Sequence, residues 1–327
     1  MTASDDFASA PGLDDLRELI PDFKRRLRAK NRAENTVESY IRVAGDYVAF
    51  LEEQGMSTAA ADQTHKFLEH FFETMRDRPN ARTGKPLSSA YVAKYYRSLQ
   101  QFFRWMYEIE DVIPVNPFGK MSPPDVPDVL TEVLTEGQIR ALLDTTKGKK
   151  TFEALRDRAL MLLFLDTPIR VGEATPLTVA NRQTGESGDF DFETDVVSVF
   201  GKGRRARSMP FGATTGEALR RYFRARPRHP LAAKSDAAWL GRKGPLTEWG
   251  IRHMINRRAE EAGLPHIHPH MFRHTFAHRW LVEGGQEQDL MRLAGWKSRQ
   301  MVGRYGASSG VERAHKAHRK AGLIDRL

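Results

Sequence analysis

The sequence predicts a mainly helical protein of two domains, an all-helical one followed by a mixed α/β one with a small antiparallel sheet. Three observations lead to this prediction. The 327 residues suffice for two domains that each bury a core. Apolar side chains recur at helical spacing through most of the chain. The segment 196–210 instead has the alternating pattern and glycine-containing turn of a β-hairpin.

Shifts in composition divide the chain. Polar and acidic residues open it, and a proline cluster, Pro123, Pro124 and Pro127, indicates a stiff, extended linker. The predicted parts are a flexible leader at 1–16, a helical domain at 17–120, a linker at 121–134 and a second domain at 135–327.

Four helices are predicted in the first domain. The expected segments are a basic stretch at 22–30, a helix from a capping box of Asn35 and Glu38 to Gly55, a helix at 67–75, and a helix from Ser88 or Ser89 to about Met106. Asn116-Pro117 then breaks the pattern. The aromatic side chains of these helices are in phase on one face, so we expect them to form the core rather than stack on bases.

The second domain is predicted to begin with a capping box of Thr135 and Gln138. Its expected helices are 136–145, 151–166, 214–225, 247–262, 270–283, 286–294 and 298–305. The hairpin strands are expected at 196–200 and 204–210. Gly306 and the run 308–310 predict a flexible break after the last helix, and residues 311–324 can form a short basic helix beyond it.

The charge balance favours a polyanionic partner. The chain has 51 Lys and Arg against 42 Asp and Glu, a formal net charge of +9, and basic side chains displace counterions from phosphates. Charge alone leaves an anionic membrane surface, or no such partner, open. The absence of cysteine excludes disulfides and thiolate chemistry and fits the cytoplasm. Without a signal peptide or a long apolar run, we expect no membrane association.

Two basic side chains stand where the backbone would hold them rigidly. Arg170 follows the apolar helix 151–166, and its planar guanidinium can face a phosphate there. Lys202 lies between two glycines at the hairpin turn, where it can reach a DNA groove or donate a proton. Each has an ordinary alternative, a surface arginine at a helix start and a charged turn.

A third segment combines a histidine with an arginine. His270 and Arg273 share one face of the predicted helix 270–283, which suits proton handling beside a bound anion. A pair of surface polar residues is the alternative. The five histidines could also suggest a metal site: His266, His268, His270, His274 and His278. They have no cysteine or carboxylate among them and lie on different helix faces, so we predict neither a metal nor a cofactor.

The fourth segment is Gly295-Trp296, followed by Tyr305 nine positions after the tryptophan. Alone, Trp296 would be assigned to the core and Tyr305 would be unremarkable. The four segments in this order resemble the tyrosine recombinase, or phage integrase, family in its Xer-like two-domain form. The resemblance covers 135–306. It extends more loosely to the helical domain, which is similar to the family's SAM-like core-binding domain, and it includes no arm-binding domain.

The resemblance implies a role for each residue in the pattern. Arg170 and Arg273 would hold the scissile phosphate, and Lys202 would protonate the departing 5′ oxygen. His270 would assist as acid or base, and Tyr305 would attack to form a 3′-phosphotyrosine. A phenol with a pKa of about 10 is a weak nucleophile, so it needs a base and a phosphate whose charge is neutralised. The covalent bond conserves the energy of the broken phosphodiester, so no ATP is required.

Three further positions bear on the resemblance. Trp296 stands where the family more often has histidine, and would supply packing and one N–H donor. Glu173 falls at the family's structural carboxylate. Pro168 departs from the pattern, because the family commonly has glycine before its first arginine.

The implied activity is site-specific recombination of double-stranded DNA. A homotetramer on paired recombination sites would exchange strands through a Holliday junction, with the segment after the nucleophile docked on the neighbouring protomer; accessory proteins stay unknown. A solvated basic tail that adds DNA affinity is the alternative for that segment. The alternative activities are DNA relaxation of the type IB topoisomerase kind and DNA binding without catalysis.

Overall fold

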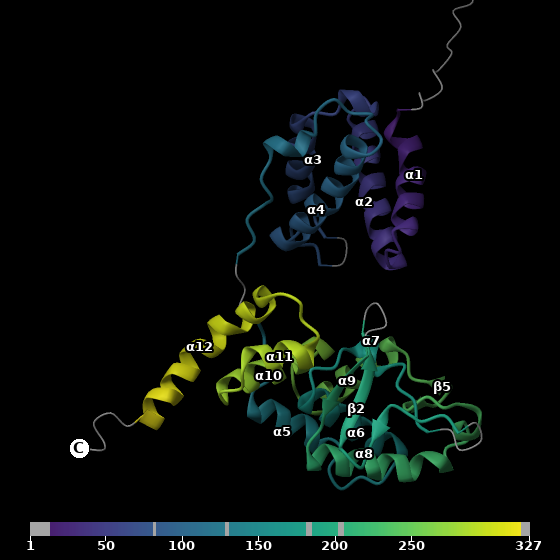
Figure 1. Ribbon diagram of the computed structural model, residues 1–327, viewed down its shortest axis with the longest axis vertical. Coiled ribbons are helices and arrows are strands. Elements are labelled where there is room, and N and C mark those ends of the chain that lie inside the picture. Colours follow the sequence, from purple (N-terminus) through teal and green to yellow (C-terminus); the bar gives the residue numbers. More distant parts are fainter. Residues whose placement is uncertain (1–13, 81–82, 128–130, 181–184, 202–205, 322–327) are drawn as a thin grey trace, which may run out of the picture. The chain divides into compact units, whose positions relative to one another are not determined.

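The computed structural model describes residues 14–80, 83–127, 131–180, 185–201 and 206–321 (Figure 1). The chain divides into two compact units, Met1–Asp128 and Val129–Leu327, and the division falls inside the predicted linker. The first unit is helical, and the second combines helices with small antiparallel sheets, as predicted. None of the helices described is both long and apolar enough to span a bilayer.

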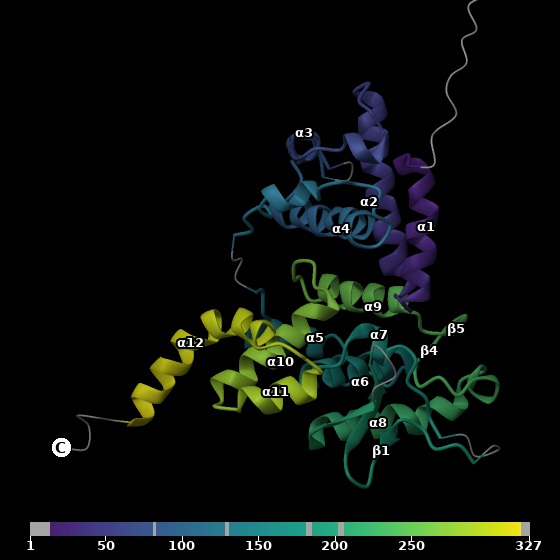
Figure 2. The same ribbon diagram turned by 45° about the horizontal axis from the view of Figure 1, so that its top comes forward.

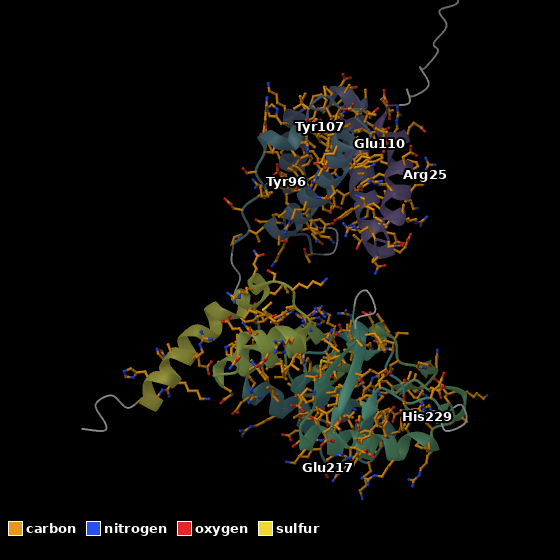
Figure 3. All side chains as sticks on the ribbon, viewed as in Figure 1. Arg25, Tyr96, Tyr107, Glu110, Glu217 and His229 are labelled. Atoms are coloured by element: carbon orange, nitrogen blue, oxygen red, sulfur yellow. The ribbon has the colours of Figure 1, made fainter. Side chains whose placement is uncertain are left out.

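The first unit is a cluster of amphipathic helices around an aromatic core. Its elements are α1 (Leu16–Ala29), α2 (Glu34–Glu53), η1 (Ala60–Asp62), α3 (His65–Asp77), α4 (Ser89–Glu108) and η2 (Pro117–Lys120). Tyr47, Phe102 and Phe103 are fully buried, so the prediction that the in-phase aromatic residues form the core is confirmed. Tyr96 of α4, labelled in Figure 3, donates a hydrogen bond to the carbonyl of Met121 at 3.1 Å, which ties the start of the linker to this core.

Two predictions about the first unit are wrong. The predicted leader is too long, because Asp15 caps α1 by accepting from the Arg17 N–H at 2.9 Å and Leu16 is fully buried. Residues 1–13 lie outside the described part of the chain. The capping box of Asn35 and Glu38 does not form. The helix begins at Glu34, two residues before the start that this capping box would give, so Asn35 already lies in its first turn.

The second unit contains eight α-helices in its described part. They are α5 (Glu136–Asp144), α6 (Phe152–Asp166), α7 (Val171–Ala174), α8 (Ala213–Ala225), α9 (Glu248–Glu261), α10 (Pro269–Val282), α11 (Glu287–Ala294) and α12 (Arg299–Ala321), with 3₁₀ turns η3 (Arg226–Arg228) and η4 (Ala232–Lys234). The capping box of Thr135 and Gln138 is present at the start of α5. The single-turn helix α7 and the turns η3 and η4 were not predicted.

The predicted hairpin forms the centre of a three-stranded antiparallel sheet. β1 (Phe190–Asp191) pairs with β2 (Val196–Phe200), which pairs with β3 (Ala206–Pro210). Val197 and Val199 point into the core, while the alternate residues Ser198 and Phe200 are exposed. A second ribbon of β4 (Leu240–Gly241) and β5 (Gly244–Pro245) had no sequence signal.

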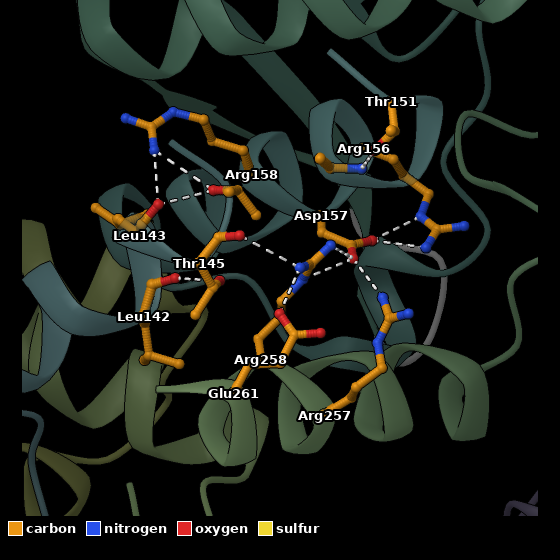
Figure 4. A network of polar contacts seen from close by, with 12 residues as sticks. Leu142, Leu143, Thr145, Thr151, Arg156, Asp157, Arg158, Arg257, Arg258 and Glu261 are labelled. Carbon is orange, nitrogen blue, oxygen red and sulfur yellow. Dashed lines mark hydrogen bonds and ion pairs between the residues drawn. The ribbon is translucent and has the colours of Figure 1, made fainter. Parts of the chain in front are cut away.

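The core of the second unit is built around α6, which packs against α8, α9 and α10 (Figure 2). The helix carries a buried carboxylate, Asp157, in addition to its apolar residues. Asp157 accepts hydrogen bonds from Arg156 at 2.6 and 2.9 Å, from Arg257 at 2.8 Å and from Arg258 at 2.7 and 3.0 Å (Figure 4). Because α6 ends at Asp166, this network fixes the helix that leads to Arg170.

The predicted flexible break after Tyr305 is wrong. α12 runs without interruption through Gly306 and Gly310 to Ala321. Its first turns pack on α10 through Val302 and Tyr305, which anchors a helix whose glycines would each cost about 1 kcal/mol in isolation. The region 311–321 therefore continues the helix instead of forming a separate one.

Candidate active site

Glu173 joins two arginines at the start of α7. Its side chain is 7% exposed and accepts hydrogen bonds from Arg207 at 2.9 and 2.6 Å and from Nη1 of Arg170 at 2.9 Å. Burial alone would raise the pKa of Glu173, but the hydrogen bonds from Arg207 and from the Arg170 backbone N–H lower it. The carboxylate is therefore ionised, and it orients Arg170, whose side chain is 37% exposed and free to meet a ligand.

Arg207 of β3 connects this pair to the end of α11. Its Nε donates to the carbonyl of Leu293 at 3.0 Å. Gly295 ends α11 in the left-handed conformation, with φ of 64°, and a Cβ there would lie 3.0 Å from Nη1 of Arg207. Glycine at this position thus serves both the turn and the close approach of the arginine.

Arg273 is held in the interior of the second unit. It is 4% exposed, its Nη2 donates to the carbonyl of Ala294 at 2.7 Å, and its Nη1 donates to the carbonyl of Pro168. Burial lowers the pKa of Arg273 to about 9, and the nearby Arg170 adds to this effect. Glu173 offsets only part of the positive charge of Arg170, Arg207 and Arg273, so a bound phosphate would be stabilised here.

Trp296 lies between Arg273 and Tyr305. The guanidinium carbon of Arg273 is 5.1 Å from the centre of the indole ring, a cation–π distance. Tyr305 stacks on the same indole with centroids 5.2 Å apart and planes 12° from parallel. Nε1 of Trp296 is buried and has no hydrogen-bond partner among the described residues, so an external acceptor would stabilise it.

Tyr305 is 3% exposed, and its hydroxyl lies 2.5 Å from Nδ1 of His274. His270, one turn earlier on α10, is exposed; its ring centroid is 6.3 Å from that of His274. Burial lowers the pKa of His270, as do the charges of His268, Arg252 and Arg273. The imidazole of His270 is therefore neutral at pH 7 in the absence of an anion.

The structure brings five of the six predicted residues together: Arg170, His270, Arg273, Trp296 and Tyr305. The sixth, Lys202, lies outside the described residues, between the strands of the confirmed hairpin. Within the described ranges, no group of three or more His, Asp or Glu side chains is arranged to hold a metal ion.

Sequence reasoning missed Arg207 and the contact of His274. Arg207 lies two positions before the buried Met209, on the same face of β3, and nothing in the hairpin pattern indicates that it meets Glu173. His274 follows Arg273 directly, and only the packing of α12 on α10 makes it a neighbour of Tyr305.

Residues 132–310 match the sequence model of the phage integrase family. The chain belongs to this family. The protein is 30% identical to the tyrosine recombinase XerC of Bacillus subtilis, over 81% of this chain and 83% of that one. It is 29% identical to the tyrosine recombinase XerC 1 of Ralstonia nicotianae, over 84% of this chain and 83% of that one.

Solved structures of integrases and Xer recombinases share the fold. The Tn1549 transposon integrase in complex with circular intermediate DNA aligns with a TM-score of 0.65 at 21% identity, over 89% of this chain and 94% of that one. XerH bound to a palindromic difH substrate aligns with a TM-score of 0.66 at 17% identity, over 97% and 98%. The protein is a tyrosine-type site-specific DNA recombinase.

Proposed function

We propose that Tyr305 is the nucleophile of this recombinase and that Arg170 and Arg273 hold the scissile phosphate. The observation that carries the proposal is the stack of Arg273, Trp296 and Tyr305, which places a buried phenol beside two arginines. Burial destabilises the charged form of Arg273, and the negative charge of a bound phosphate stabilises that form again.

The reaction follows from these groups. The phenol oxygen attacks phosphorus while the two guanidinium groups stabilise the charge that develops on the equatorial oxygens. Lys202 protonates the departing 5′ oxygen, and His270 contacts the phosphate as acid or base. Nε1 of Trp296, which has no hydrogen-bond partner among the described residues, donates to the same phosphate. A 3′-phosphotyrosine results, and attack by a 5′-hydroxyl reverses the steps without a cofactor.

The substrate is double-stranded DNA with paired recombination sites, held by the helical domain and the catalytic domain on either side of the linker. We expect four protomers to assemble on two sites and to exchange strands through a Holliday junction. The compartment we expect is the cytoplasm. A plasmid-relaxation assay run beside a two-site recombination assay separates this activity from topoisomerase activity.

The variant Tyr305→Phe tests the nucleophile, because it removes the phenol oxygen and keeps the stacked ring. We expect normal DNA binding by gel shift and no covalent adduct on a denaturing gel. An adduct formed by this variant would contradict the assignment. Cleavage by the wild-type protein should persist in EDTA and without ATP, and a strict need for a divalent metal would contradict the side-chain phosphate clamp.

Truncation after Gly310 tests the assembly. The removed part of α12 contacts α10 and its C-cap in the same chain. Oε2 of Glu312 lies 3.6 Å from Nε2 of His278, and Lys316 pairs with Glu283. If its end docks on a neighbouring protomer, half-site binding stays near normal while paired-site assembly and recombination are lost. Weaker half-site binding with a shallower salt dependence and intact assembly would show a phosphate-contacting tail instead.

A further inference from the structure

The hydroxyl of Tyr305 is joined to a titratable side chain to which the phosphotyrosine mechanism above gives no role. Nδ1 of His274 lies 2.5 Å from the hydroxyl oxygen, and the two ring centroids are 5.3 Å apart. His274 is on α10 and Tyr305 is on α12. Because these two helices pack on one another through Ala277 and Val302, the contact is supported by the core of the second unit.

We propose that His274 is the base that accepts the phenolic proton of Tyr305 when the phenol oxygen attacks DNA. The proposal rests on the assignment of Tyr305 as nucleophile. A neutral imidazole that carries its proton on Nε2 has a lone pair on Nδ1, and the tyrosine O–H donates to that lone pair.

The step balances in atoms and charge. As the bond from the Tyr305 oxygen to phosphorus forms, the phenolic O–H breaks and an N–H forms on Nδ1 of His274. The bond from phosphorus to the 5′ oxygen breaks, and that oxygen takes a proton from Lys202. In the rejoining step the 5′-hydroxyl attacks phosphorus and gives its proton back to the neutral amine of Lys202. The phenolate leaves, and the imidazolium of His274 returns its proton to it.

Two observations separate His274 from His270. His274 is half-buried against Tyr305, whereas His270 is exposed and lies in the field of three arginines, Arg170, Arg252 and Arg273. That field suits a side chain that contacts the phosphate. Trp296 fixes the plane of the Tyr305 ring by stacking at 12°, so the contact with His274 sets where the hydroxyl proton points.

The matched variants His274→Asn and His270→Asn test the proposal. An asparagine amide reaches the position of Nδ1, so His274→Asn keeps a hydrogen-bonding group there but removes the ability to take a proton. We expect unchanged thermal melting and half-site binding. We expect single-turnover cleavage slower by about 10²- to 10⁴-fold, the usual contribution of a general base.

Chemical rescue distinguishes a base from a merely structural contact. A fluorinated tyrosine introduced at position 305 ionises at lower pH, so it should restore most of the rate in His274→Asn and little of it in His270→Asn. A substrate with sulfur at the 5′ bridging position should rescue Lys202→Ala but not His274→Asn, because sulfur relieves the need for an acid and not for a base.

Three results would overturn the proposal. In the first, His274→Asn cleaves at the wild-type rate, and in the second, fluorotyrosine restores cleavage in His270→Asn alone. In the third, His274→Asn melts at a lower temperature and binds DNA more weakly, and fluorotyrosine does not restore its cleavage. These results differ from a failure of the nucleophile assignment. In that case Tyr305→Phe would still form a covalent adduct, whatever the behaviour of the His274 variants.

Discussion

The substitution Asp157→Asn should strongly destabilise the catalytic unit. Asp157 is fully buried on α6 and receives hydrogen bonds from three arginines. Two of them are themselves buried, with side chains 7% exposed at Arg156 and 6% exposed at Arg258. Asparagine keeps the size of the side chain but leaves Arg156 without its counter-charge. Arg258 then retains only the partly exposed Glu261, whose Oε2 lies 2.7 Å from its Nη1.

The magnitude follows from this burial. Removing one partner of a buried ion pair costs about 3–5 kcal/mol, because the remaining charge stays desolvated. Arg257, with a side chain 42% exposed, can turn to solvent and adds little. Arg156 also donates to the carbonyl of Leu240 at 2.8 Å, which retains part of its hydrogen bonding. For a unit of this size the loss corresponds to a melting temperature lower by roughly 6–20 °C.

Urea unfolding followed by tryptophan fluorescence measures this loss. Four of the five tryptophans lie in the second unit, including the fully buried Trp239, so the signal reports mainly on that unit. The control is Asp144→Asn, since that exposed carboxylate lies 3.9 Å from the exposed Lys147 and should change stability by less than about 0.5 kcal/mol. A loss below about 1 kcal/mol for Asp157→Asn would refute the reasoning, because the arginines would then have found other partners.

Three further predictions concern the active site. Lys202→Ala should slow cleavage by about 10²- to 10⁴-fold, and a substrate with sulfur at the 5′ bridging position should restore the rate. If the rate is not restored, Lys202 is a positioning contact. Trp296→Phe should retain more cleavage activity than Trp296→Ala, because the alanine variant loses the stack on Tyr305 and about 3–5 kcal/mol of stability. An equal loss of cleavage activity in both variants would show that the indole N–H dominates. In DNA-free protein, NMR should find His270 titrating below its ordinary 6.5, and Arg252→Gln should raise the midpoint. The pKa of His270 is lower in the folded than in the unfolded protein, so protonation of His270 reduces the stability of the fold as the pH falls below 6.5. A titration midpoint of His270 above 6.5 would contradict the geometry.

Helix positions were predictable where apolar periodicity and capping residues agree. α6, α8, α9 and α10 lie within one or two residues of their predicted bounds. The failures occurred where tertiary packing overrides local signals. Gly306 and Gly310 predict a break, yet α12 continues because its first turns are anchored on α10. Asp15 and Leu16 belong to the fold although polar residues precede them, because the fully buried Leu16 anchors the start of α1 in the core.

The sequence by itself determined the class of chemistry. The order and spacing of five residues resemble those of the tyrosine recombinase family: Arg170, Lys202, His270, Arg273 and Tyr305. That resemblance implies phosphoryl transfer to a tyrosine, and it can be recognised because spacing along one helix or one hairpin is a local property. Which side chains touch across elements is not local.

Only the tertiary structure decided that Glu173 bridges Arg170 and Arg207, and that Tyr305 meets His274. These contacts join residues as far as 34 positions apart. They depend on how α12 packs against α10 and how β3 lies beside α7. The packing of separate helices and strands is set by the summed fit of many apolar side chains, and no single motif in the sequence records it.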